Sequence, residues 1–93
     1  MAVAIVTLRL SLPGAHSLKD KRRIVKSLKD RLRQRFNVAV AEMEHHDVWQ
    51  TACLDVVTVS PDGTFANSTV SKVAEYVRRD ARLALVDYSI EVY

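Results

Sequence analysis

Hydrophobic residues recur along this chain with two different periods, and the order of the periods constrains the fold more than any other feature. Residues 2–12 alternate apolar and polar side chains, which is typical of a half-buried strand. Over 18–36 the apolar side chains instead return every three or four residues, which predicts an amphipathic helix. Ser17 precedes this helix and Asp20 follows three residues later, a weak form of the capping-box pattern.

The same two periods repeat in the second half of the chain. Segments 38–44 and 49–60 are rich in β-branched residues and predict two antiparallel strands joined by a tight hairpin. A turn at 61–63 leads into a second amphipathic helix that runs to about residue 80. The last segment, 82–92, predicts a strand whose buried side carries Val86, Tyr88, Ile90 and Val92.

The resulting order βαββαβ predicts an α+β, ferredoxin-like fold. It consists of a four-stranded antiparallel sheet with both helices on one face, and residues 1–93 form a single domain. The other face of the sheet stays open. We expect it to present Ile5, Thr7, Arg9, Asp55, Val57, Asp87, Ser89 and Glu91.

Charge is distributed unevenly along the chain. Between residues 16 and 36 there are nine Lys and Arg against two Asp, a net charge of +7. The whole chain carries only +3, so the remainder carries −4. A basic segment in an otherwise acidic small domain indicates a polyanion as partner.

The basic charges of the first helix predict a phosphate-binding surface. Helical spacing places the stripe of Lys19, Arg22, Lys26, Lys29 and Arg33 opposite the apolar face. The predicted RNA- and phosphate-binding residues are Ser17, Lys19, Lys21, Arg22, Arg23, Lys26, Lys29 and Arg33. A solvated helix surface is the alternative for the stripe, and a plain helix cap is the alternative for Ser17.

One segment around this helix has a distinctive motif. LPGAHSLKDKRR at 12–23 places a Ser-Leu-Lys-x-Lys-Arg core directly after a Pro-Gly turn. With FNV at 36–38, AE at 41–42 and WQ at 49–50, the sequence resembles the small bacterial YlxP-like family over nearly its whole length. The resemblance implies a ferredoxin-like fold. It also implies an association with translation or ribosome assembly, because members of this family, which has no agreed activity, are often encoded beside such factors.

The sequence is therefore compatible with two classes of function. The first is a non-enzymatic RNA-binding protein, plausibly bound to ribosomal RNA, that contacts phosphates through the basic helix. The second is a protein-interaction module or homodimer that uses the open sheet face, where Ile5 and Val57 would form the contact. The outward positions of the central strands have no aromatic residue, so stacking of bases on this face is not expected.

The sequence gives little support for an enzyme. Glu42, Glu44, His45, His46 and Asp47 form the one cluster with metal-ligand chemistry, but neighbouring strand residues point to opposite faces, which favours a polar hairpin tip over a metal site. We expect no metal, cofactor or small-molecule substrate. The apolar runs are too short to span a bilayer and no export signal is recognised, so the expected location is cytoplasmic, without membrane contact.

Overall fold

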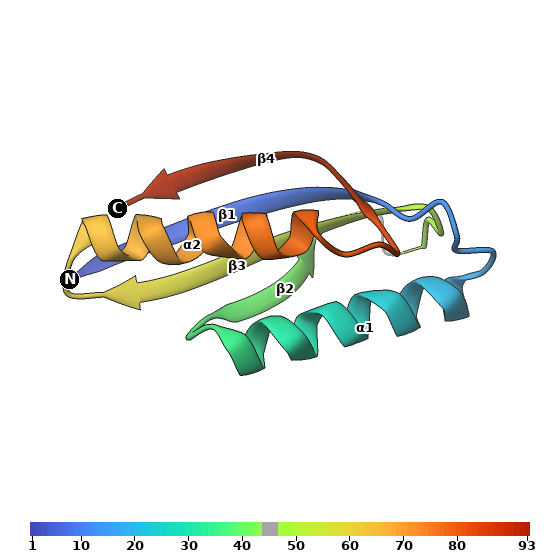
Figure 1. Cartoon of the computed structure of the whole chain (residues 1–93), viewed down its shortest axis with the longest axis horizontal. Helices are drawn as coiled ribbons and strands as arrows, with labels where there is room; N and C mark the ends of the chain where they lie inside the picture. The colour runs from blue at the N-terminus through green and yellow to red at the C-terminus, as the bar shows by residue number, and fades with distance from the viewer. Residues whose placement is uncertain (44–46) are drawn as a thin grey trace.

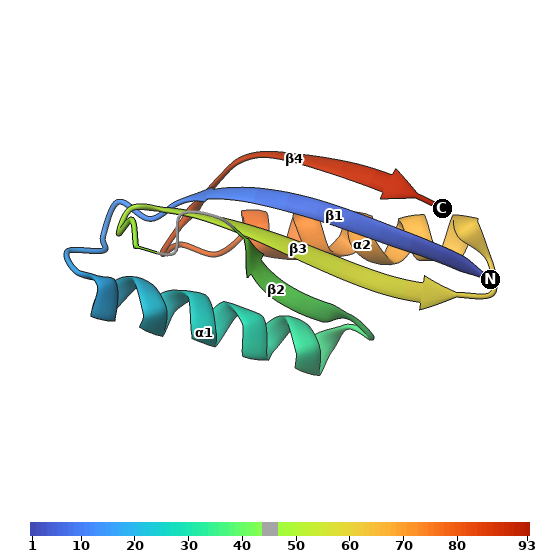
Figure 2. The same ribbon diagram turned by 180° about the vertical axis from the view of Figure 1, so that it is seen from behind.

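The computed structural model describes residues 1–43 and 47–93, and its elements follow in the predicted βαββαβ order. The strands and helices are β1 (Ala2–Ser11), α1 (Leu18–Arg35), β2 (Ala39–Met43), β3 (Thr51–Ser60), α2 (Gly63–Arg78) and β4 (Ala84–Val92). The four strands form one antiparallel sheet in the order β2-β3-β1-β4. Figures 1 and 2 show the arrangement from opposite sides, with the two chain ends close together at one end of the sheet.

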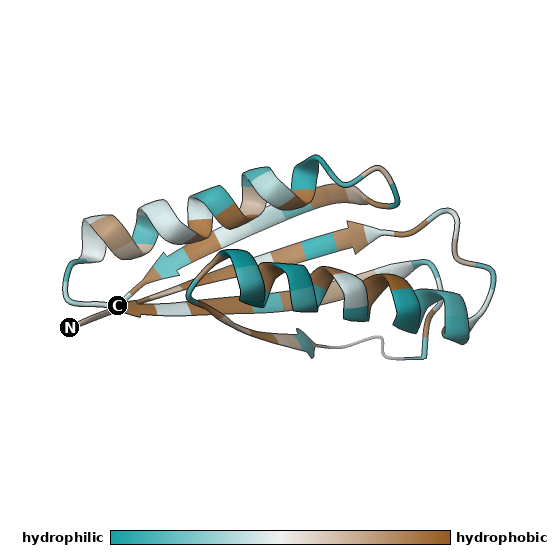
Figure 3. Cartoon of the chain, turned by 60° about the horizontal axis from the view of Figure 1, so that its bottom comes forward, coloured by the Kyte–Doolittle hydropathy of each residue, from teal (hydrophilic) through white to brown (hydrophobic). Residues whose placement is uncertain are grey.

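Both helices cover the same face of the sheet. Figure 3 shows them side by side, with brown apolar segments alternating with teal polar ones along each. The core lies between the helices and the sheet, where β1 contributes Ala4, Val6 and Leu8 with no exposed surface at all. Val25, Leu28 and Leu32 of α1 and Val70, Val73 and Val77 of α2 complete its centre.

The sheet register confirms the predicted open face. Ile5 lies opposite Val57 and Glu91, and Thr7 lies opposite Asp55 and Ser89, so these side chains share one side of the sheet. On this face the Thr7 hydroxyl donates to Asp55 at 2.7 Å. The guanidinium of Arg9 also lies 3.4 Å from the Asp87 carboxylate.

The predicted buried side of the last strand is wrong for Val86 and only partly covered at Tyr88 and Val92, which are 41% and 45% exposed. Tyr88, Ile90 and Val92 lie opposite buried residues of β1, as expected, but Val86 is 65% exposed. The register shifts between Arg9 and Leu10, which face Asp87 and Leu85, so Val86 is the extra residue of a bulge. Because β4 is an edge strand, its other inward residues are also only partly covered.

Element boundaries differ slightly from the predictions. The helix expected over 18–36 ends at Arg35, with Phe36 as its cap. The strand expected from 49 begins at Thr51, and the second helix ends at Arg78. These shifts of one or two residues leave the topology unchanged.

Candidate functional site

The start of α1 is fixed by its own sequence. The Ser17 Oγ accepts from the backbone N–H of Asp20 at 3.0 Å, and the Asp20 carboxylate accepts from the N–H of His16 at 3.1 Å. Asp20 also places a negative charge near the positive end of the helix dipole. The hydroxyl of Ser17 is thus engaged as a helix cap, the alternative to a phosphate ligand in the sequence analysis.

One predicted phosphate ligand lies inside the protein. The Lys21 side chain is 1% exposed, and its Nζ lies 3.0 Å from Oε2 of Glu42 on β2. Lys21 stands one helical repeat ahead of Val25 and Leu28, on the face that α1 turns to the sheet. We therefore correct the prediction and remove Lys21 from the phosphate-binding set, because its ammonium group is buried against a carboxylate.

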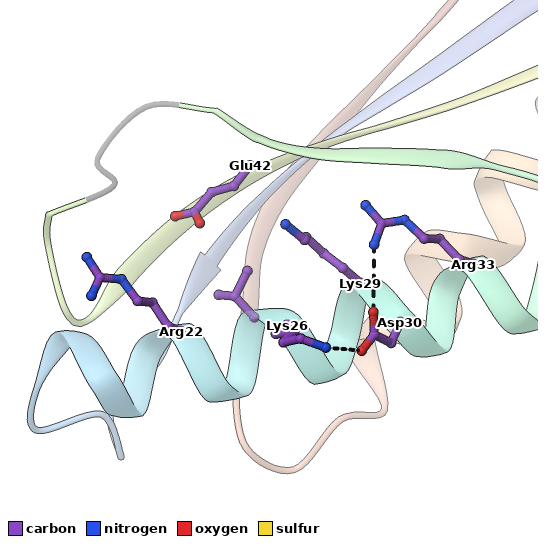
Figure 4. Close-up of a pocket in the computed structure, with 7 residues that line it drawn as sticks. Arg22, Lys26, Lys29, Asp30, Arg33 and Glu42 are labelled. Atoms are coloured by element: carbon purple, nitrogen blue, oxygen red, sulfur yellow. Dashed lines mark hydrogen bonds and ion pairs between the residues drawn. The ribbon is translucent and has the colours of Figure 1, made fainter.

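The stripe residues line a groove between α1 and β2. Its volume is about 450 Å³, and its walls are Arg22, Val25, Lys26, Lys29, Asp30, Arg33 and Glu42. Figure 4 shows Arg22, Lys29 and Arg33 directed toward the β2 side of the helix, while Lys26 lies along the helix toward Asp30. The structure thus brings together four of the five predicted stripe residues.

Asp30 partly neutralises this groove. It accepts from Lys26 at 2.9 Å and lies 3.7 Å from Arg33. The hydrogen bond from Lys26 lowers the pKa of Asp30, so this carboxylate stays charged at neutral pH. Arg33 also donates to the carbonyl of Val40 at 3.1 Å, which ties the end of α1 to β2.

Two further predicted residues lie outside the groove. Arg23 is exposed and lies 3.6 Å from Asp20, on the side of the helix away from β2. Lys19 is exposed in the first turn. Within residues 1–43 and 47–93, no ion pair involves Lys19, Arg22 or Lys29.

A charge cluster that no sequence pattern predicted joins α1 to the residues that follow α2. The Asp80 side chain is 3% exposed and accepts from Arg31 of α1 and from Arg82 at 3.0 Å. These hydrogen bonds hold the pKa of Asp80 well below its usual value, and the one from Arg82 has the largest effect. Burial acts in the opposite direction. No local sequence signal marks this cluster, because Arg31 and Asp80 are far apart in the chain.

The remaining candidates are the five residues of the predicted polar hairpin tip. Glu44, His45 and His46 lie outside the described residues, while Asp47 is exposed and Glu42 is paired with Lys21. In the part of the chain that the structure describes, no group of three or more His, Cys, Asp or Glu could hold a metal ion. Nor does any described helix have the length and hydropathy to cross a membrane.

The predicted protein-contact residues, Ile5 and Val57, lie side by side on the open sheet face and are half-buried. Val59 and Tyr93 extend this apolar surface toward the chain ends and are 55% and 69% exposed. Sequence reasoning did not select these two residues, although Val59 follows from the alternation of β3.

Comparison with known proteins decides the family. The family model described as protein of unknown function (DUF503) matches residues 3–90. The chain belongs to this family. The uncharacterized protein YlxP of Bacillus subtilis (strain 168) is 29% identical to this chain over 63 residues, which are 68% of each chain.

Among solved structures, the fold is similar to that of a de novo designed protein with a ferredoxin fold, studied by solution NMR. The TM-score is 0.51 at 16% identity, with 100% of this chain and 84% of the designed chain covered. This similarity supports the ferredoxin-like fold and nothing beyond it. The predicted family and fold are therefore both confirmed.

Proposed function

We propose that this DUF503 member is a non-enzymatic, cytoplasmic RNA-binding protein that lies against structured RNA, such as ribosomal RNA, with the exposed face of α1. The observation that carries the proposal is the groove in which Arg22, Lys29 and Arg33 lie together at the surface. Guanidinium and ammonium groups in such a row bind phosphates without reading bases. The resemblance to proteins encoded beside translation factors supports a ribosomal source for the RNA.

The test is binding of the purified protein to bacterial 30S subunits and to an unrelated duplex RNA across a salt series. Contact with about five phosphates predicts a logarithmic salt slope of roughly −4, with the duplex-DNA value of about 0.9 per phosphate as a stand-in. Tighter binding to 30S subunits with this slope supports a ribosomal role. Equal binding to both RNAs would contradict the ribosomal assignment, and binding to neither would contradict the proposal as a whole.

A pair of charge-matched variants assigns the binding to the groove. Arg22→Gln with Lys29→Gln lowers the net charge by two and should make the slope less steep by about two. Arg9→Glu lowers the net charge by the same amount on the opposite face of the sheet. An equal loss of affinity in both variants would show that only the overall charge matters, and would contradict the assignment.

A second candidate function is contact with another protein, or with a second copy, through the open sheet face. The exposed surface of Val59 and Tyr93 beside Ile5 and Val57 favours it. Light scattering of the natural chain and of Val57→Lys gives its test. A dimer that becomes monomeric in the variant supports the candidate, and a natural chain that is monomeric contradicts homodimerisation.

A further inference from the structure

A second cluster of cations lies on the helical side of the molecule, in the seam between α1 and α2. Arg35 comes from the end of α1, Lys72 from the second half of α2, and Arg79 from the cap of α2. With Phe36, Glu75 and Tyr76 they line a cleft of about 340 Å³. All three cations are exposed, and none has an ion-pair partner among the described residues.

The Tyr76 ring of this cleft already has neighbours. The Cζ atoms of Arg35 and Arg31 lie 5.1 and 5.7 Å from the ring centroid of Tyr76. Phe36 meets the same ring edge-on, with 5.9 Å between the centroids. A nucleobase would therefore have to displace an arginine to stack on Tyr76, although stacking is the usual means of holding single strands. The cleft offers charge, and its natural ligand is a phosphate.

The large exposed aromatic side chains lie elsewhere. In the described residues they are Trp49 in the loop before β3, Phe65 in the first turn of α2, and Tyr88 and Tyr93 in or after β4. None lines the α1 groove or the seam cleft, although Tyr88 lies near Arg78 of α2, whose Cζ is 5.9 Å from its ring centroid. The two sets of cations themselves therefore offer mainly charge to a ligand.

From these observations we infer that the RNA partner is double-stranded and that the seam cluster, Arg35, Lys72 and Arg79, contacts a second phosphate backbone. The inference rests on the proposed function, in which the α1 groove contacts the first backbone. From Lys19 to Arg33 the stripe extends roughly 21 Å at 1.5 Å per residue, and the seam lies on the other side of α1, toward α2.

A-form RNA offers the matching arrangement. Its minor groove is wide and shallow, so two backbones are accessible on one face of the duplex, and duplexes are recognised there by shape and phosphate contacts. A single strand has one flexible backbone, which would have to bend around α1 to reach both sets of cations, whereas a duplex presents two backbones at a fixed spacing. Two separate sets of cations, with no large exposed aromatic side chain among the described residues that line them, therefore favour a duplex over a single strand.

The test compares a 20-base-pair RNA duplex with each of its single strands, at one salt concentration and then over a salt series. Lys72→Gln with Arg79→Gln removes two charges from the seam, and Arg9→Glu is again the charge-matched control on the sheet face. We expect the seam variant to bind the duplex roughly tenfold more weakly, with a slope less steep by about two. The control should stay within about twofold of the natural chain.

A variant that is expected to bind the duplex more tightly controls for misfolding. Among the described residues that line the seam cleft, Glu75 is the one carboxylate, and it is exposed. Glu75→Gln should strengthen duplex binding several-fold, because a negative charge beside the phosphate is removed. A variant that failed to fold could not bind more tightly.

The outcomes separate this inference from the proposed function. A natural chain that binds neither RNA form contradicts both. Loss of binding in Arg22→Gln with Lys29→Gln, together with full duplex affinity in the seam variant, overturns the inference and leaves the proposed function standing. Tighter binding to single strands than to the duplex overturns the inference as well.

Discussion

Asp80 joins the two helices, and its replacement by Asn is the sharpest test of how the basic face is held in place. The carboxylate side chain is 3% exposed and accepts from Arg31 of α1, from Arg82 at 3.0 Å and from the Arg82 backbone N–H at 2.9 Å. An Asn side chain in its place could keep the bond from the backbone but not the charge. A hydrogen bond to a charged group contributes about 1.5 to 3 kcal/mol, and breaking a buried pair costs about 3 to 5 kcal/mol.

The expected loss lies below the upper end of that range. The side chains of Arg31 and Arg82 are 35% and 41% exposed, so water can solvate both when the carboxylate is gone. We expect Asp80→Asn to lower the free energy of unfolding by about 2 to 3 kcal/mol, and the melting temperature by roughly 10 to 20 °C. Urea unfolding at pH 7 measures the first quantity. The control is Asp87→Asn, since the Asp87 side chain is 64% exposed at 3.4 Å from Arg9, and an exposed pair contributes at most about 1 kcal/mol.

The pH dependence gives a second, independent measurement. The pKa of Asp80 is lowered in the folded protein, so its contribution to stability is fully present above the unfolded-state pKa, near 4, and is lost as the pH falls below it. The difference in stability between the natural chain and Asp80→Asn should therefore shrink between about pH 5 and pH 2. A difference that stays constant over this interval, or one below about 0.5 kcal/mol at pH 7, would refute the reasoning.

Three further substitutions test other parts of the structure. Ser17→Ala should lower the free energy of unfolding by about 1 kcal/mol, because the N–H of Asp20 loses its acceptor. Urea unfolding measures this loss, and an unchanged stability would contradict the role of Ser17 as a helix cap. Leu28→Ala should cost about 3 kcal/mol in the same assay, since Leu28 has no exposed surface, and a loss below about 1 kcal/mol would contradict its place in the core. Lys21→Met with Glu42→Leu should leave the salt slope of RNA binding unchanged, because Lys21 is buried. A less steep slope would show that Lys21 contacts phosphate after all.

Periodicity accounts for most of the fold, and it fails where a residue does not follow its local pattern. Val86 continues the apolar alternation of 86, 88, 90 and 92, but a bulge opposite Arg9 and Leu10 turns it outward. Nothing in the local sequence marks that bulge. Because β4 is an edge strand, its side chains are less tightly enclosed there than those of β1 or β3.

Lys21 shows a different limit. Its place on the apolar stripe, with Val25 and Leu28, was visible in the spacing, and so was the inward position of Glu42 next to Val40 on β2. Each residue alone resembled a surface charge. Only the packing of α1 against β2 brings the two together, and that is a tertiary contact between distant segments. The same holds for Arg31 and Asp80. Exposed cations can therefore be predicted from helical spacing, whereas buried ion pairs between distant segments cannot.

The separation of charge between the two sides of the molecule has a physical consequence. Residues 18–35 carry nine cations against two carboxylates and residues 63–82 carry four against two, which leaves these two segments with +9 and the rest of the chain with −6. Like charges along one helix repel each other and reduce its stability. Glu42, Asp30 and Asp80 relieve the repulsion at Lys21, Lys26 and Arg31, but Arg22 and Lys29 form no ion pair with any described residue in a groove that faces solvent. Stability alone gives no reason for these two charges, whereas a bound polyanion would neutralise them, which is the reason that the proposed RNA contact is placed on the helical side.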